Sequence, residues 1–90
     1  MKFEWDPLKA SRNESKHGVS FVEAIEVFGD NLSSTARDPD HSFDEERFVI
    51  FGKSTSGSYL VVSFTERGAR IRIISARSMT RRERRAYEYK

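Results

Sequence analysis

Residues 47–76 read RFVIFGKSTSGSYLVVSFTERGARIRIISA, and three runs within them are rich in Val, Ile, Phe and Tyr. The runs extend from Arg47 to Gly52, from Tyr59 to Glu66 and from Ala69 to Ala76, with the polar residues 54–58 and Arg67-Gly68 between them. β-Branched and aromatic residues bounded by turn residues are typical of strands. We therefore expect an antiparallel meander of three strands.

A short strand and a first helix are expected ahead of these runs. Apolar and polar side chains alternate over residues 1–5, which is the pattern of a half-buried strand. Asp6-Pro7 then combines a capping residue with a proline at the first helical position. The sequence therefore predicts a helix from Pro7 to Lys16 that ends at Gly18.

The spacing of Ser20 and Glu23 is that of a capping box and opens a second helix, which Gly29 ends. Its apolar residues recur at i, i+3, i+4 and i+7, so the helix is expected to lie on the sheet; they are Phe21, Ala24, Ile25 and Phe28. A short edge strand is predicted within Leu32 to Arg37, before the turn at Asp38-Pro39-Asp40.

Thr80 and Glu83 repeat the capping-box spacing and predict a basic helix through Tyr87. Helices and strands are segregated along the chain, which is typical of an α+β fold. We expect a small antiparallel sheet with two N-terminal helices packed on it and a C-terminal basic helix. The 90 residues are expected to form a single domain, residues 1–90.

Composition excludes several classes of protein. The chain has no cysteine, which rules out disulfides, thiolate zinc sites and cysteine nucleophiles. The longest uninterrupted apolar stretch, Tyr59 to Val62, is far shorter than the roughly 20 residues that span a bilayer. The amino terminus lacks the apolar run of a signal peptide. We therefore expect a cytoplasmic protein with no membrane partner.

The charges are divided unevenly along the chain. Residues 1–66 hold 7 basic and 12 acidic side chains, whereas residues 67–90 hold 9 basic and 2 acidic ones. Eight of those nine are arginines, whose planar guanidinium matches phosphate oxygens. A polyanion is therefore the expected partner, although a solvated helix face would have a similar composition.

Alternation along the last predicted strand places Arg70, Arg72 and Ile74 on one face and Ile71, Ile73 and Ser75 on the other. An unpaired guanidinium on a central strand is costly. Arg72 is therefore expected either to meet a carboxylate such as Glu46 or to line a concave site for an anion.

Two histidines are candidates for proton transfer. His17 follows Lys16 at the turn between the two predicted helices, and an imidazole can both take and give a proton near neutral pH. A surface or capping role is the alternative. His41 lies beside Asp38 and Asp40, but three ligands crowded into four loop residues are a poor match to a metal site, so no metal is expected.

Other catalytic patterns are missing from the sequence. It contains no glycine-rich phosphate loop, no nucleophile elbow and no HExxH motif. Tyr87 and Tyr89 follow the arginine run of the last helix, where aromatic rings could stack on unpaired bases. The alternative is that one of them packs the helix onto the sheet.

Together these residues resemble the BrnT family of toxins over nearly the whole chain. Two unbroken blocks carry most of the resemblance, Lys16-His17-Gly18-Val19-Ser20-Phe21 and Arg72-Ile73-Ile74-Ser75-Ala76-Arg77. Further matching positions are Trp5-Asp6, Lys9, Asn13, Ala24, Asp38, His41, Glu46-Arg47, Gly52, Glu83-Arg84 and Tyr87. Met79 departs from the family, which commonly has a small residue there.

The resemblance implies a RelE-like fold and an endoribonuclease that blocks translation without a cofactor. It also implies a cognate antitoxin of the ribbon-helix-helix type, similar to BrnA. Operator DNA would be bound only through the complex with that antitoxin. A nucleic-acid-binding or protein-interaction module that cuts nothing is the rival interpretation.

For an RNA-cleaving enzyme of this kind we assign hypothetical roles to the candidate residues. His17 is expected to act as base or acid, Arg72 and Arg77 to hold the phosphate, and Lys16 to assist electrostatically. The expected contacts to the RNA backbone are Arg70, Arg81 and Arg84, and Tyr87 is expected to stack or donate a proton. His41 and Arg47 are secondary candidates, since Arg47 could equally form a structural pair with Glu46.

Overall fold

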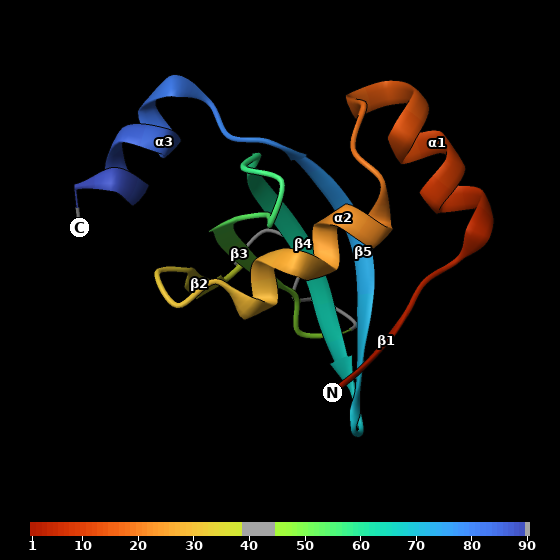
Figure 1. The fold of residues 1–90 in the computed structure, drawn as a ribbon. Coiled ribbons are helices and arrows are strands. Elements are labelled where there is room, and N and C mark those ends of the chain that lie inside the picture. The colour runs from red at the N-terminus through yellow and green to blue at the C-terminus, as the bar shows by residue number, and fades with distance from the viewer. Residues whose placement is uncertain (39–44, 90) are drawn as a thin grey trace.

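The computed structural model describes residues 1–38 and 45–89, which form one mixed five-stranded sheet with helices around it (Figure 1). The elements follow in the order β1 (Lys2–Glu4), α1 (Pro7–His17), α2 (Phe21–Ala24), the 3-10 helix η1 (Ile25–Gly29), β2 (Ser34–Arg37), β3 (Phe48–Lys53), β4 (Tyr59–Arg67), β5 (Arg70–Ser78) and α3 (Arg81–Glu88). The predicted α+β fold, the three-strand meander and the short edge strand are confirmed.

The sheet has the strand order β1-β5-β4-β3-β2. Strands β2 to β5 pair antiparallel with their neighbours, as predicted, but β1 runs parallel to β5. The expectation of a wholly antiparallel sheet was therefore wrong. The reason lies in α1, whose Asn13 contacts Ala76 near the end of β5. Because β1 leads directly into α1, it has to run in the direction of β5.

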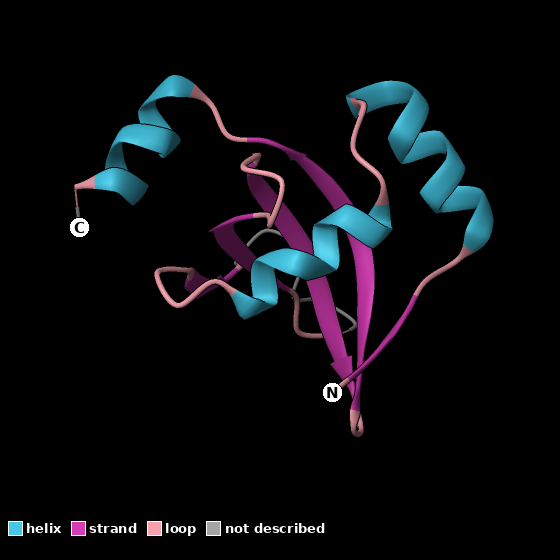
Figure 2. Ribbon diagram, in the orientation of Figure 1, coloured by secondary structure: helices cyan, strands magenta, loops and turns pink. Residues whose placement is uncertain are grey.

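The second predicted helix is divided into a short α-helix, α2, and the 3-10 helix η1. Phe21, Ala24 and Val27 are its buried residues, and their three-residue spacing fits the three residues per turn of a 3-10 helix. Phe28 and Ile25, which an α-helical stripe would bury fully, are only partly buried. Figure 2 shows α2 and η1 crossing one face of the sheet, where the core lies.

Gly52 allows η1 to approach β3 closely. A Cβ atom at this position would lie 2.9 Å from the Cβ atom of Val27 and 3.2 Å from its carbonyl oxygen. Val27 is fully buried, so neither atom can move aside at low cost. The glycine thus fixes the distance between the helical layer and the sheet.

The helix ends follow the predicted signals. Asp6 accepts a hydrogen bond from the backbone N–H of Leu8 at the start of α1, and Gly18 ends that helix in the left-handed conformation with φ 71°. Thr80 and Glu83 form the predicted capping box of α3. No helix in residues 1–38 or 45–89 is both long and apolar enough to cross a membrane.

Candidate functional site

An extra residue in β5 determines which side chains share a face of the sheet. Ser63 pairs with Ser75 but the next residue, Phe64, pairs with Ile73, so Ile74 is a bulge. Residues that pair across the ladder point to the same face. Arg72, Ser75 and Arg77 therefore lie together on the face opposite the core, which we call the arginine face.

This arrangement corrects the strict alternation expected from the sequence. Without the bulge, Ser75 and Arg77 would point with Ile71 and Ile73 into the core. The structure instead buries Ala76 on the core side and leaves Arg77 partly exposed. The bulge thus brings both predicted phosphate-binding arginines to one surface.

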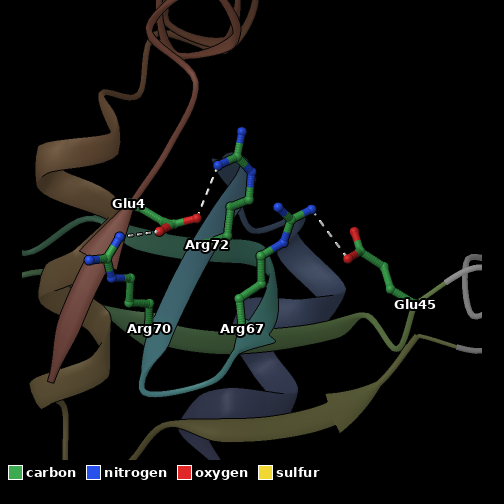
Figure 3. Close-up of polar contacts among 5 residues, drawn as sticks. All are labelled: Glu4, Glu45, Arg67, Arg70 and Arg72. Atoms are coloured by element: carbon green, nitrogen blue, oxygen red, sulfur yellow. Dashed lines mark hydrogen bonds and ion pairs between the residues drawn. The ribbon is translucent and has the colours of Figure 1, made fainter.

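Glu4 is the acid that pairs with Arg70 and Arg72, at the end of the arginine face where β5 begins. Its carboxylate lies 3.1 Å from a guanidinium nitrogen of Arg72 and 3.4 Å from one of Arg70. Figure 3 shows the Glu4 carboxylate between the two guanidiniums. Arg67 lies on the side of Arg72 away from Glu4 and reaches towards Glu45. The hydrogen bond from Arg72 is the main cause that lowers the pKa of Glu4. The expected partner Glu46 pairs with Arg37 instead.

Arg77 forms a two-pronged ion pair with Glu83. Its two terminal nitrogens lie 2.8 and 2.9 Å from the two carboxylate oxygens, and one of them also donates to the carbonyl of Ser78. The hydrogen bonds from Arg77 lower the pKa of Glu83 to about 2 and, in return, raise the pKa of Arg77. Because Glu83 also caps α3, this pair joins the helix to the sheet.

Asn13 attaches α1 to the free edge of β5. Its side-chain amide donates to the carbonyl of Ala76 and accepts from the backbone N–H of the same residue, at 2.9 and 3.1 Å. It also donates to the carbonyl of Val19 beyond the end of the helix. The side chain is buried and replaces the strand that β5 lacks here, because β1 pairs only with Arg70 to Arg72.

A shallow cavity of about 220 Å³ lies along this junction. We call it the α1 seam; it is lined by Lys9, Arg12, Asn13, Lys16, His17, Ile74 and Ser75. His17 is therefore next to Ser75, which belongs to the arginine face between Arg72 and Arg77. The predicted imidazole therefore shares a cavity with one residue of the arginine face, whereas Arg72 and Arg77 do not line that cavity.

Helix α3 follows β5 and lies at the Arg77 end of the arginine face, opposite the end where Glu4 pairs with Arg72. Tyr87 is buried, donates its hydroxyl to Asp30 and packs edge-on against Tyr59 with ring centres 5.7 Å apart. Burial, reinforced by the hydrogen bond to Asp30, raises the pKa of Tyr87 to about 12. Tyr87 thus has the packing position that the sequence left open as an alternative, whereas Tyr89 is exposed.

The predicted RNA contacts on α3 are separate from the α1 seam. The guanidinium of Arg84 lies 4.0 Å from the centre of the Tyr59 ring and 3.7 Å from Glu88. Arg81 is exposed on the same helix. A second cavity, of about 400 Å³, separates α3 from β2 and β3 and is lined by Ser34, Phe51, Arg82, Glu83, Ala86 and Tyr87.

The secondary candidates have different outcomes. Arg47 precedes β3, and its buried Nε has no hydrogen-bond partner within residues 1–38 and 45–89. His41 lies outside the described residues. Over the described ranges, no group of three or more His, Asp or Glu side chains could hold a metal ion.

Sequence reasoning missed three kinds of residue. Ser75 was assigned to the wrong face, because a bulge leaves no local signal. Glu4 was not expected to pair with Arg72, because 68 residues separate them. Lys9 and Arg12 received no role, although their spacing with Lys16 at i, i+3 and i+7 already predicts a shared helix face.

Comparison with known proteins supports the resemblance. A model of the family described as the ribonuclease toxin BrnT of type II toxin-antitoxin systems matches residues 5–83. Among solved structures, the crystal structure of the Brucella abortus ribonuclease toxin BrnT aligns with a TM-score of 0.67 and 25% sequence identity, covering 90% of this chain and 99% of that one. No curated protein sequence matches significantly.

Proposed function

Because the chain belongs to the BrnT family of ribonuclease toxins of type II toxin-antitoxin systems, we propose that it is an endoribonuclease that cuts RNA by attack of a 2′-hydroxyl on the adjacent phosphate. The observation that carries this proposal is the α1 seam, whose lining His17 shares with Ser75, a residue on the same sheet face as Arg72 and Arg77. A proton-transfer group beside cations is what such a reaction needs.

In the proposed reaction, His17 takes the proton of the 2′-hydroxyl or gives one to the leaving oxygen. A bond forms between the 2′-oxygen and phosphorus, and the bond from phosphorus to the 5′-oxygen breaks. The 5′-oxygen gains a proton, so the products are a 2′,3′-cyclic phosphate and a 5′-hydroxyl. Lys16, on the same cavity as His17, contributes positive charge near the phosphate.

Arg72 and Arg77 are proposed to stabilise the negative charge that builds up on the phosphate. Each is paired with an acid of the same chain, Arg72 with Glu4 and Arg77 with Glu83. Arg72 gives Glu4 a single hydrogen bond and, within the described part of the chain, its other N–H groups remain available to phosphate. Arg77 gives Glu83 two and the carbonyl of Ser78 one, so fewer of its five N–H groups remain available to phosphate.

We propose that the reaction uses no metal ion. The chemistry of the α1 seam supports this, because lysine, arginine, histidine, asparagine and serine side chains surround it. Catalytic magnesium requires carboxylate oxygens, which are missing from that lining. The positive charge for the transition state would come from the side chains themselves.

Three further properties follow from the family and are part of the proposal. RNA cleavage would inhibit translation in the host cell. The protein antitoxin that a type II toxin requires would be of the ribbon-helix-helix type, similar to BrnA. Operator DNA would be contacted by that antitoxin within the complex, with this chain bound to it.

The test is incubation of the purified protein with a defined RNA, with and without EDTA, followed by analysis of the new ends. We expect cleavage that EDTA does not abolish and a 2′,3′-cyclic phosphate on the 5′ fragment. His17→Ala should slow cleavage about 10²- to 10⁴-fold, and Arg72→Ala about 10²- to 10³-fold. Wild-type rates for both variants would contradict the assignment.

Expression in a bacterium separates cleavage from simple binding. Growth arrest with cleaved RNA, absent in cells that produce His17→Ala at the same level, is the expected result. Lys2→Ala, which removes an exposed cation of β1, is the matched control and should remain toxic. Unaffected growth together with salt-dependent RNA binding would assign the chain to the non-catalytic class instead.

A further inference from the structure

We propose that Lys9 and Arg12 bind phosphates that neighbour the cleaved phosphate on the same RNA strand. The α1 seam would then extend the substrate-binding surface beyond the reacting groups. The inference rests on the proposed function, because it takes RNA as the polyanion acted on beside His17. It adds two positioning residues and gives the RNA backbone a direction, from the arginine face onto α1.

The first reason is the geometry of α1. Lys9, Arg12, Lys16 and His17 follow the i, i+3, i+7 and i+8 spacing of a single helix face, and all four line the same cavity. Asn13 lies in the middle of that face and fixes it against Ala76. The cations are therefore held at a defined position relative to β5.

The second reason is that these cations lack acid partners within residues 1–38 and 45–89. Across the described residues, ion pairs occupy the arginines of the sheet and one arginine of α3: Arg37, Arg67, Arg70, Arg72, Arg77 and Arg84. None of the ion pairs formed within those residues involves Lys9, Arg12 or Lys16. Like charges three and four residues apart repel each other on a helix. A bound polyanion would relieve that repulsion, which a purely structural role does not require.

The third reason is continuity with the proposed reaction centre. Ser75 and His17 line the cavity together with Lys9 and Arg12, and Ser75 lies on the arginine face. Consecutive phosphates of one strand can therefore contact Arg72, the His17 region and α1 in turn. An acidic protein partner would also be attracted to α1, but this shared lining with His17 favours RNA.

The experiment measures binding of a 2′-O-methyl RNA oligonucleotide, which lacks the attacking hydroxyl and so stays intact. In Lys9→Ala/Arg12→Ala we expect affinity about five- to tenfold weaker at 0.1 M salt. The slope of log affinity against log salt should become shallower by about 1.4, since each lost phosphate contact on a single strand removes about 0.7. Cleavage by the same variant should show a raised KM with kcat retained.

Two controls make the result specific. Arg37→Ala/Lys53→Ala removes the same charge from strands β2 and β3 and should leave the salt slope near that of the wild type. Lys9→Arg/Arg12→Lys keeps the charges and should restore binding. An unchanged slope in Lys9→Ala/Arg12→Ala would overturn the inference and leave α1 to an acidic protein. Absence of cleavage by the wild type would instead contradict the proposed function.

Discussion

Asn13 is the single residue on which the position of the α1 seam depends most. It is buried, and its amide makes three hydrogen bonds to the backbone of Ala76 and Val19. An amide side chain in the middle of a helix usually faces solvent, because it gains nothing from burial without partners. Here one donor and the acceptor match the backbone of Ala76 at the edge of β5, and the second donor satisfies the carbonyl of Val19.

We therefore expect Asn13→Ala to lower the free energy of unfolding by about 2 to 4 kcal/mol, because it leaves buried backbone groups of Ala76 and Val19 without partners. Urea unfolding followed by circular dichroism measures the change. Ser11→Ala, on an exposed position of the same helix, should stay within about 0.5 kcal/mol of the wild type. Equal stability of the two variants would mean that Asn13 is not the attachment of α1.

The ion pair between Glu83 and Arg77 should make stability depend on pH in the acid range. The pKa of Glu83 is lowered from 4.5 to about 2, so the unfolded chain binds a proton there that the folded chain does not. Stability from this pair is present above pH 4.5 and is lost as pH falls towards 2. Both side chains are partly exposed, so we expect a loss of about 1 to 2 kcal/mol.

Glu83→Gln is the suitable comparison, since glutamine retains the capping box but not the charge. Unfolding free energies of the two proteins should converge as pH falls from 4.5 to 2. Other carboxylates, including Glu4 and Glu23, also have lowered pKa values, but they contribute equally to both proteins. A constant difference in unfolding free energy between the two proteins across this pH range would show that the ion pair contributes no pH-dependent stability.

At the scale of elements, the close approach of η1 to β3 is the feature most sensitive to a small change. Gly52→Ala would place a methyl group 2.9 Å from the Cβ of Val27, so we expect a loss of about 1 to 3 kcal/mol of stability. Gly29→Ala is a matched control at the end of η1, because a Cβ there has nothing within 4 Å. Thermal unfolding of both variants tests this, and equal midpoints would contradict it.

Local signals predicted which elements exist. The caps at Asp6, Ser20 and Thr80 are confirmed by hydrogen bonds from Leu8, Glu23 and Glu83. These signals act over two or three residues and are therefore visible in the sequence. The strand runs were equally clear, because their β-branched and aromatic residues stand between turn residues.

Features that depend on distant packing could not be predicted in this way. The bulge at Ile74, the parallel pairing of Phe3 with Ile71 and the 3-10 winding of η1 each satisfy contacts between remote segments. The same holds for the candidate site: the turn after α1 is a local signal and pointed to His17 as a candidate, whereas no local signal pointed to the acids that pair with Arg72 and Arg77. Their identity follows from which elements meet, and this is set by the whole fold.

At the scale of the whole molecule, internal acids occupy the arginines that we propose as RNA contacts. The uneven charge along the sequence suggests a basic C-terminal segment. In the fold, however, Glu4 forms ion pairs with Arg70 and Arg72, and Glu83 forms one with Arg77. The unpaired cations of the described residues therefore include those of α1, far from the basic segment in the sequence. Net charge alone does not locate the surface that binds RNA.

Competition between these acids and RNA phosphates for the arginines can be measured by removing the acids. Glu4→Gln/Glu83→Gln adds two to the net charge and frees three arginines, so the 2′-O-methyl RNA oligonucleotide should bind about threefold to tenfold more tightly. Glu26→Gln/Glu66→Gln adds the same charge, but Glu26 lies in η1 and Glu66 pairs with Ile71 on the core side. If competition is local, only the first variant gains the full increase, and the gain persists at 0.3 M salt, where long-range attraction is screened. Equal affinities of the two variants at that salt concentration would mean that the internal acids do not restrict the arginine face.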